Sequence, residues 1–259
     1  MDPTVNEWLQ LVFRWVHVLA GIMWIGHLYF FNFVNSQVAK TYDADSKKKV
    51  IPELMPRALY WFRWGAAYTW VTGFLLAGMV YYQGSNLLPA DSSTSLGAGI
   101  GLSLLLIVAV FFIYDALWKA MAKNEQGGVI VSFVLVAVLL WGLSRVFAPR
   151  AVYIHLGMLF GTIMAMNVWM RIWPAQKKII AAVKAGTAPD AALAAMAGLR
   201  SKHNTYMSVP LVLSMVSNHY PTVYGSPHGW VFLVVLVAIG WGLTKLLYMN
   251  AARPAPAKY

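Results

Sequence analysis

The chain has 259 residues, of which 59% are hydrophobic and 11% are charged, and its formal net charge is +11. Soluble domains carry about 25% charged residues, so this composition excludes an ordinary soluble domain and indicates an integral membrane protein. The sequence contains no cysteine, which excludes disulfides, cysteine-ligated iron–sulfur clusters and covalent c-type haem within it. The basic residues lie mostly between apolar segments, which indicates membrane topology and not binding to nucleic acid.

Seven apolar segments are long enough to cross a bilayer. The sixth is the shortest and is interrupted by Pro210. We therefore predict an all-α integral membrane bundle of about seven transmembrane helices, formed by a single domain over residues 1–259. The segments lie near residues 8–36, 60–82, 95–118, 127–147, 151–173, 204–221 and 228–249.

The charge of the loops predicts the orientation of the bundle. The alternate loops 83–94 and 222–227 carry no basic residue, and the alternate loop 145–150 carries only Arg145 and Arg150. By the positive-inside rule, the N-terminus is expected outside and the C-terminus in the cytoplasm. Residues 174–202 then form a cytoplasmic connector, whose alanines and Pro189 favour a helical hairpin. The basic residues of the other loops and of the tail are Lys40, Lys47, Lys48, Lys49, Arg57, Lys119, Lys123, Lys177, Lys178, Lys184, Arg200, Lys202, Arg253 and Lys258.

Histidines are the most informative polar residues of the apolar segments. A polar group in a membrane helix costs free energy unless it binds a cofactor, relays a proton or forms a hydrogen bond. A bis-histidine haem needs one imidazole from each of two helices at matching depth. The rise of 1.5 Å per residue suggests two such pairs, one of His17 with His155 and one of His27 with His203. Hydrogen bonding between helices is the alternative for each. The two remaining histidines, His219 and His228, are expected at the outer surface.

Motifs for hydrolysis or nucleotide binding are absent, because the sequence has no HExxH, no P-loop and no GxGxxG. Asp115 is the only acidic residue within a segment, and its position four residues before Lys119 predicts an ion pair. A proton pump would need a carboxylate near the middle of the membrane. Arg14 and Arg63 are expected to extend toward the membrane surfaces, or to pair with the propionates of a haem.

Three segments together carry a family resemblance. Residues 15–34 (WVHVLAGIMWIGHLYFFNFV), 153–176 (YIHLGMLFGTIMAMNVWMRIWPAQ) and 201–221 (SKHNTYMSVPLVLSMVSNHYP) resemble the membrane domain of the bacterial urate hydroxylase family, the urate oxidase N-terminal type. The third is the most specific. The resemblance implies a multi-pass oxidoreductase domain of the bacterial inner membrane, usually joined to a C-terminal c-type cytochrome. The matching positions are His17, His27, His155, His203, Asn204 and His219.

The sequence departs from the family in one respect, because it ends at Tyr259 without a CxxCH motif. We therefore expect a separate c-type cytochrome, or other subunits of a membrane complex, as the electron-transfer partner. The expected cofactor is haem b, one or two per chain, with His17 and His155 holding the outer haem iron and His27 and His203 the inner one.

Two other functions remain open. The first is an enzyme that oxidises urate or a related purine, with Arg200 and Asn204 as substrate-binding donors and His203, Asn204 and His219 as catalytic candidates. The second is a non-catalytic accessory subunit of a membrane complex, in which the histidines only form hydrogen bonds between helices.

Overall fold

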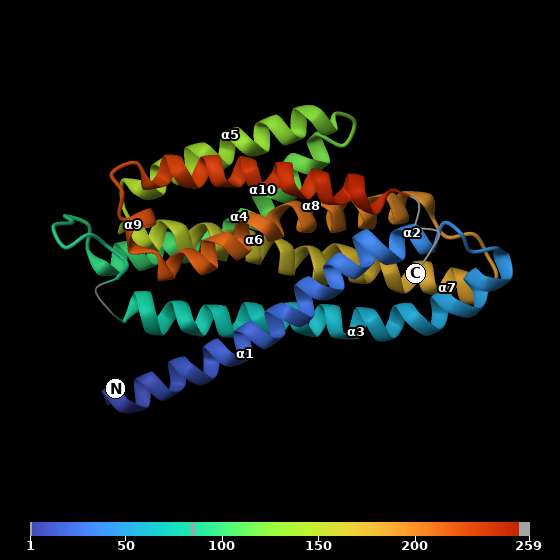
Figure 1. Ribbon diagram of the computed structural model, residues 1–259, viewed down its shortest axis with the longest axis horizontal. Coiled ribbons are helices and arrows are strands. Elements are labelled where there is room, and N and C mark those ends of the chain that lie inside the picture. Colours follow the sequence, from blue (N-terminus) through green and yellow to red (C-terminus); the bar gives the residue numbers. More distant parts are fainter. Residues whose placement is uncertain (1, 84–85, 254–259) are drawn as a thin grey trace. The chain divides into compact units, whose positions relative to one another are not determined.

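The computed structural model describes residues 2–83 and 86–253, and all regular structure within these residues is helical. The predicted all-α class is therefore confirmed. Three short π-helical segments, η1, η2 and η3, each continue an α-helix. Figure 1 labels the α-helices along the chain. In chain order the elements are α1 (Pro3–Tyr29), η1 (Phe30–Asn35), α2 (Ser36–Val38), α3 (Ala44–Ala77), η2 (Gly78–Tyr82), α4 (Leu96–Ala120), α5 (Glu125–Ser144), α6 (Pro149–Asn167), η3 (Val168–Ile172), α7 (Trp173–Lys184), α8 (Ala191–Val216), the 3-10 helix η4 (Ser217–His219), α9 (Pro221–Tyr224) and α10 (Gly229–Ala251).

Five helical stretches of the described residues are long and apolar enough to cross a membrane: Pro3–Val38, α4, α5, Pro149–Lys184 and α10. The chain is thus a multi-pass membrane protein. Helices α3 and α8 overlap the second and sixth predicted segments. Both begin well before these segments, because polar sequence continues each helix beyond its apolar part, and both end about five residues before them. Helix α8 also runs through Pro210 and ends only at Val216.

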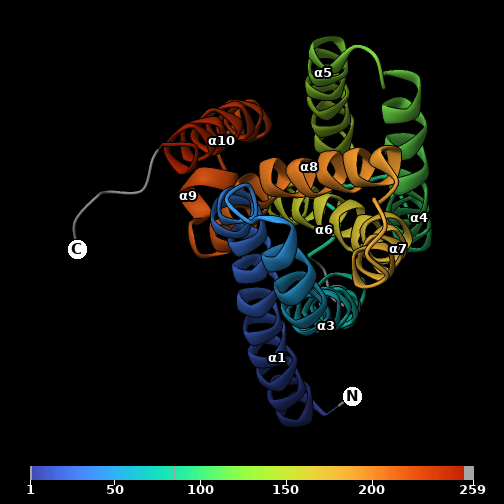
Figure 2. The ribbon, with the colours of Figure 1, turned by 90° about the vertical axis from the view of Figure 1, so that its right-hand side faces the viewer.

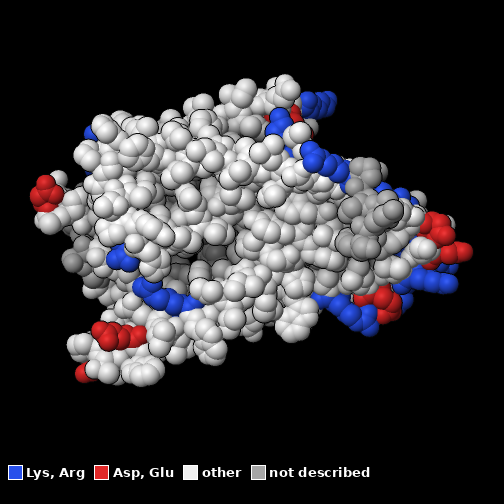
Figure 3. All heavy atoms as spheres, in the orientation of Figure 1, with Lys and Arg blue, Asp and Glu red and all other residues white. Residues whose placement is uncertain are grey.

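The protein surface agrees with a lipid environment. Trp8, Trp15 and Ile22 on α1 each expose more than 60% of their area. On the face drawn in Figure 3, a wide area carries no Lys, Arg, Asp or Glu. In water such a surface would favour aggregation, whereas in a bilayer it contacts lipid chains.

The chain divides into two compact units. Unit 1 comprises Met1–Trp15, Trp70–Ile163 and Ser208–Gly240, and unit 2 comprises Val16–Thr69, Met164–Met207 and Trp241–Tyr259. Helices α1, α3, α6, α8 and α10 contribute a segment to each unit, whereas α4 and α5 belong to unit 1 and α7 to unit 2.

Helix α6 is the packing centre of unit 1. The Trp70 indole N–H donates to the hydroxyl of Thr162 at 3.0 Å and so joins α3 to α6. Gly157 of α6 lies against Ser214 of α8, where a larger residue would clash. The expected ion pair of Asp115 with Lys119 is confirmed, since their charged groups are 2.8 Å apart.

Unit 2 is held by close backbone approach and by polar bonds between helices. A Cβ atom on Gly65 of α3 would come within 3.1 Å of the Ala20 carbonyl oxygen and the Trp24 backbone nitrogen of α1. The Arg63 guanidinium does not extend away from the protein but stacks on the Trp173 ring, 4.1 Å from its centroid. This contact gives Arg63 a packing role through a cation–π interaction.

The predicted connector 174–202 contains α7, a turn and the first part of α8, and Figure 2 shows the turn that joins them. Gly186 in this turn has a φ of 74°, which only glycine adopts at low cost. Asp190 caps α8 by accepting a hydrogen bond from the Ala192 backbone N–H at 2.8 Å. At the start of α3, the Ser46 backbone N–H donates to the Asp43 carboxylate, and this bond lowers the pKa of Asp43.

Candidate functional site

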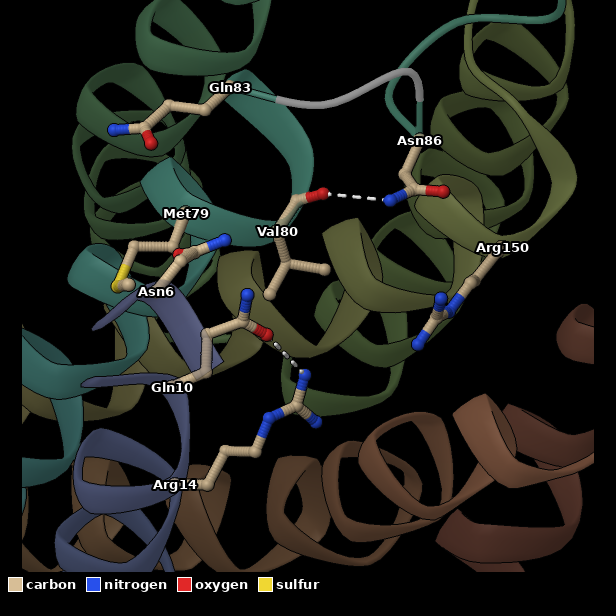
Figure 4. A pocket seen from close by; sticks show the side chains of 8 residues that line it. All are labelled: Asn6, Gln10, Arg14, Met79, Val80, Gln83, Asn86 and Arg150. Carbon is tan, nitrogen blue, oxygen red and sulfur yellow. Dashed lines mark hydrogen bonds between the residues drawn. The ribbon is translucent and has the colours of Figure 1, made fainter. Parts of the chain in front are cut away.

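Unit 1 contains an open cavity of about 450 Å³, within the size range of ligand pockets. Three of its residues, Asn6, Gln10 and Arg14, recur every four residues and so share one face of α1. Six of the eight lining side chains are amides or guanidinium groups, and none is acidic. The lining residues are Asn6, Gln10, Arg14, Met79, Val80, Gln83, Asn86 and Arg150 (Figure 4).

The polar side chains of the cavity are held by few bonds. The Arg14 guanidinium donates to the Gln10 side-chain oxygen at 3.4 Å, and the Asn86 amide donates to the Val80 carbonyl at 3.0 Å. The Oδ1 atom of Asn6 is buried and has no hydrogen-bond partner among the described residues. Figure 4 shows Gln10, Arg14 and Arg150 directed toward the same space. Most of their hydrogen-bonding capacity therefore remains for a ligand.

This arrangement suits a small planar anion. Guanidinium groups bind carboxylate-like and other flat oxygen-bearing groups through paired N–H donors. Amides add both donors and acceptors, and no lining carboxylate repels the ligand. Among these residues, only Arg14 was predicted from sequence to bind a ligand group, the propionate of a haem. The spacing of Asn6, Gln10 and Arg14 was the available signal, but nothing in the sequence brings Arg150 to them.

His155, a predicted haem ligand in unit 1, is fully engaged in hydrogen bonds. Its Nδ1 lies 2.7 Å from the Ala151 carbonyl oxygen, so Nδ1 carries the proton. Its Nε2 then accepts a hydrogen bond from the Ser103 hydroxyl at 2.8 Å. Its ring also stacks on Phe147, with centroids 4.4 Å apart. Coordination of an iron through Nε2 would require the Ser103 bond to break.

His27, in unit 2, has a geometry that suits a ligand. Its Nδ1 donates to the Met23 carbonyl oxygen at 2.7 Å, which leaves the lone pair on Nε2. Histidine ligands commonly have their second nitrogen fixed in this way. His203, its predicted partner, belongs to the same unit and is buried, with 9% of its surface exposed.

The other predicted site residues lie in varied surroundings. His17 is half-buried on α1 in unit 2, whereas His219 and the neighbouring loop residue His228 are exposed in unit 1. Asn204 is completely buried; its amide donates to the Met164 carbonyl oxygen at 3.0 Å and accepts from Asn167 at 2.9 Å. These bonds join α8 to α6 and occupy the groups that were predicted to bind substrate.

Arg200, the other predicted substrate-binding residue, is also buried, with 4% of its surface exposed. Both predicted donors therefore lie inside the packing of unit 2. The amide and guanidinium groups that line a cavity are instead those of unit 1.

Comparison with known families agrees with the resemblance of the three segments. The family model described as urate oxidase N-terminal matches residues 3–50 and 40–256. The chain belongs to this family. The matched ranges of the urate oxidase N-terminal model include all six histidines and all eight residues of the cavity. No curated protein and no solved structure matches the chain.

Proposed function

We propose that the chain is the membrane domain of a urate hydroxylase-like oxidoreductase, and that the cavity of unit 1 binds urate or a closely related purine anion. The observation that carries the proposal is the lining of this cavity, which joins two guanidinium groups to four amides and includes no acid. Family membership supports the redox class.

Each type of lining group has a part in holding such a ligand. Urate is flat, carries one negative charge at neutral pH and presents alternating C=O and N–H groups at its edges. Arg14 and Arg150 would bind the charged oxygen-bearing edge. Gln10 and Gln83 would bond to C=O and N–H groups, since an amide both donates and accepts. Asn6 and Asn86 would add further amides at the edge of the ligand.

Haem b is the proposed electron acceptor, and when bound it would take up one electron at a time from the substrate. His27 and His203 would hold it. Asn32 of η1 donates to the Ser201 hydroxyl at 2.8 Å, so the two helical segments that carry these histidines are in contact. They run in opposite directions (Figure 1). At about 1.5 Å per residue, His27 and His203 then differ in depth by only about 4 to 5 Å.

A buried polar group near His27, which lacks a hydrogen-bond partner among the described residues, also suits a bound cofactor. The Trp24 indole nitrogen, one turn from His27, is buried and has no hydrogen-bond partner among the described residues. Leaving a buried N–H without an acceptor costs about 1 to 3 kcal/mol. A propionate or another polar group of a cofactor would remove that cost.

The second predicted pair of haem ligands, His17 and His155, is less suited to binding a haem. His17 belongs to unit 2 and His155 to unit 1, and the Nε2 of His155 is bonded to Ser103. We therefore propose one haem, held by His27 and His203. From the haem, electrons are proposed to pass to a separate c-type cytochrome or to another subunit of a membrane complex.

Urate oxidation tests the proposal directly. Purified protein would be mixed with urate and an oxidised c-type cytochrome, and urate absorbance and cytochrome reduction followed together. Replacing Arg150 by Gln should lower kcat/KM about 10- to 100-fold, because a charge-assisted bond of about 1.5 to 3 kcal/mol is lost. Arg145→Gln is the matched control, since Arg145 lies over the Trp141 ring and not at the cavity. A wild-type protein that neither binds nor oxidises urate would refute the proposal.

A further inference from the structure

We propose that Asn218 is a positioning residue that holds the Arg150 guanidinium in the cavity and thereby makes the cavity selective for anions. The identity of the anion rests on the function proposed above. Asn218 does not line the cavity. It belongs to the SNHYP sequence at the end of the third family segment, next to the catalytic candidate His219.

The Oδ1 atom of Asn218 accepts two hydrogen bonds in unit 1. One comes from the Nε of Arg150 and the other from the hydroxyl of Tyr81, both at 2.9 Å. The amide nitrogen of Asn218 faces two carbonyl oxygens near the end of α8, those of Ser214 at 3.5 Å and Met215 at 3.3 Å. Because the nitrogen must face these acceptors, the oxygen must face Arg150 and Tyr81.

This bond leaves the rest of the Arg150 guanidinium available. Asn218 uses only the Nε–H group, and the two terminal amino groups have no hydrogen-bond partner among the described residues. Those two groups form the fork that binds flat oxygen-bearing groups in pairs. In Figure 4 the guanidinium of Arg150 is directed toward the cavity. Asn218 thus fixes the guanidinium through its Nε–H group and leaves both terminal amino groups for the ligand.

Tyr81 connects the same oxygen to the wall of the cavity. It is the fourth residue of η2, directly after the lining residues Met79 and Val80, and only 5% of its surface is exposed. Asn218 therefore ties three pieces of unit 1 together: the end of α8, the wall formed by η2, and Arg150 of α6. A neutral amide does this without cancelling the positive charge of Arg150, as a carboxylate would.

A purely structural role at the end of α8 is the alternative, and ligand charge distinguishes the two. Urate and the neutral purine hypoxanthine have similar shapes, so only the anion should depend on the orientation of Arg150. We expect Asn218→Ala to weaken urate binding about tenfold and to leave hypoxanthine binding unchanged. Asn218→Asp should keep Arg150 in place but pair with its charge, and so weaken urate binding as well. Equal weakening of both ligands would overturn the inference.

A double-mutant cycle with Arg150→Gln completes the test. If Asn218 acts through Arg150, Asn218→Ala should have no further effect on urate binding once Arg150 is replaced. Asn124→Ala is the matched control, because Asn124 caps α5 through the Gly127 backbone N–H and lies away from the cavity. It should lower the thermal midpoint without changing the preference for urate.

The same double-mutant cycle can be measured as changes in the thermal midpoint of unfolding, without any ligand. If the wild-type protein fails to bind urate, the proposed function fails, and the midpoints alone decide the inference. If the effects of Asn218→Ala and Arg150→Gln on the thermal midpoint are not additive, the positioning role is supported. Strictly additive effects overturn it.

Discussion

Ser103 is completely buried, and its hydroxyl connects the rings of two other residues. It donates to the Nε2 of His155 at 2.8 Å and accepts from the Tyr82 hydroxyl at 2.7 Å. Because Nδ1 of His155 donates to a backbone carbonyl, the donor and the acceptor of each hydrogen bond in this network are fixed. The network joins α4, α6 and η2, which gives His155 a structural role in addition to the ligand role predicted for it.

Replacing Ser103 by Ala should therefore destabilise the protein. The change leaves the buried Nε2 of His155 without a donor, at a cost of about 1 to 3 kcal/mol. The thermal midpoint in detergent should fall by roughly 2 to 4 °C for each kcal/mol. Ser144→Ala is the control, because the Ser144 hydroxyl bonds only to the Trp141 carbonyl of its own helix. An unchanged midpoint for Ser103→Ala would show that the network contributes nothing.

Haem content tests the histidine pair. His27→Ala and His203→Ala should each lose the same haem, measured by a pyridine haemochrome assay and by the reduced-minus-oxidised absorption spectrum. His228→Ala should keep full haem content, because His228 is exposed beside a loop. Full haem content in both His27→Ala and His203→Ala would exclude this pair, and a colourless wild-type protein from haem-supplied cells would favour the accessory-subunit function.

At the scale of elements, the approach of α1 to α3 depends on one glycine. A Cβ atom at Gly65 would meet backbone atoms of Ala20 and Trp24, which cannot move aside as a side chain can. Gly65→Ala should cost about 1 to 3 kcal/mol through this overpacking. Gly142→Ala in α5 is the matched control, since nothing lies within 4 Å of its added methyl group. Gly142→Ala should be neutral or stabilising, because alanine favours helix. Equal midpoints for the two variants would contradict the close approach.

The sequence predicted the existence of the helices better than their limits. Apolar length predicted seven spanning segments, and five of them match helical stretches that are long and apolar enough to span. Helix α3 runs through Pro52 and Pro56, where proline usually ends a helix. The π-helical segments have no sequence pattern of their own, and one of them, η2, forms a wall of the cavity. The histidines that match the family were named from sequence, and their role as haem ligands stays a prediction. The cavity was not, because it depends on tertiary packing that brings Arg150 to residues of α1.

At the scale of the whole molecule, the orientation predicted from loop charge can be measured with single cysteines, because the native chain has none. A cysteine at Ser93, in a loop without basic residues, should react with a membrane-impermeant maleimide added to intact spheroplasts. A cysteine at Ala185, between α7 and α8, should react only after the membrane is opened. The reverse pattern would invert the topology, and labelling of both sites in intact spheroplasts would mean that they lie on one side.

The difference in burial between helices has an evolutionary consequence. In the most apolar part of Pro149–Lys184, 78% of residues are buried inside the protein, compared with 22% in α5. A lipid-facing residue needs only to be apolar, whereas a residue enclosed by other helices must also have the right shape. Random exchange among Leu, Ile, Val and Phe should thus be accepted along most of α5 and rejected along α6. Natural variation in this family should collect at the lipid boundary, while the enclosed residues of α6 change slowly.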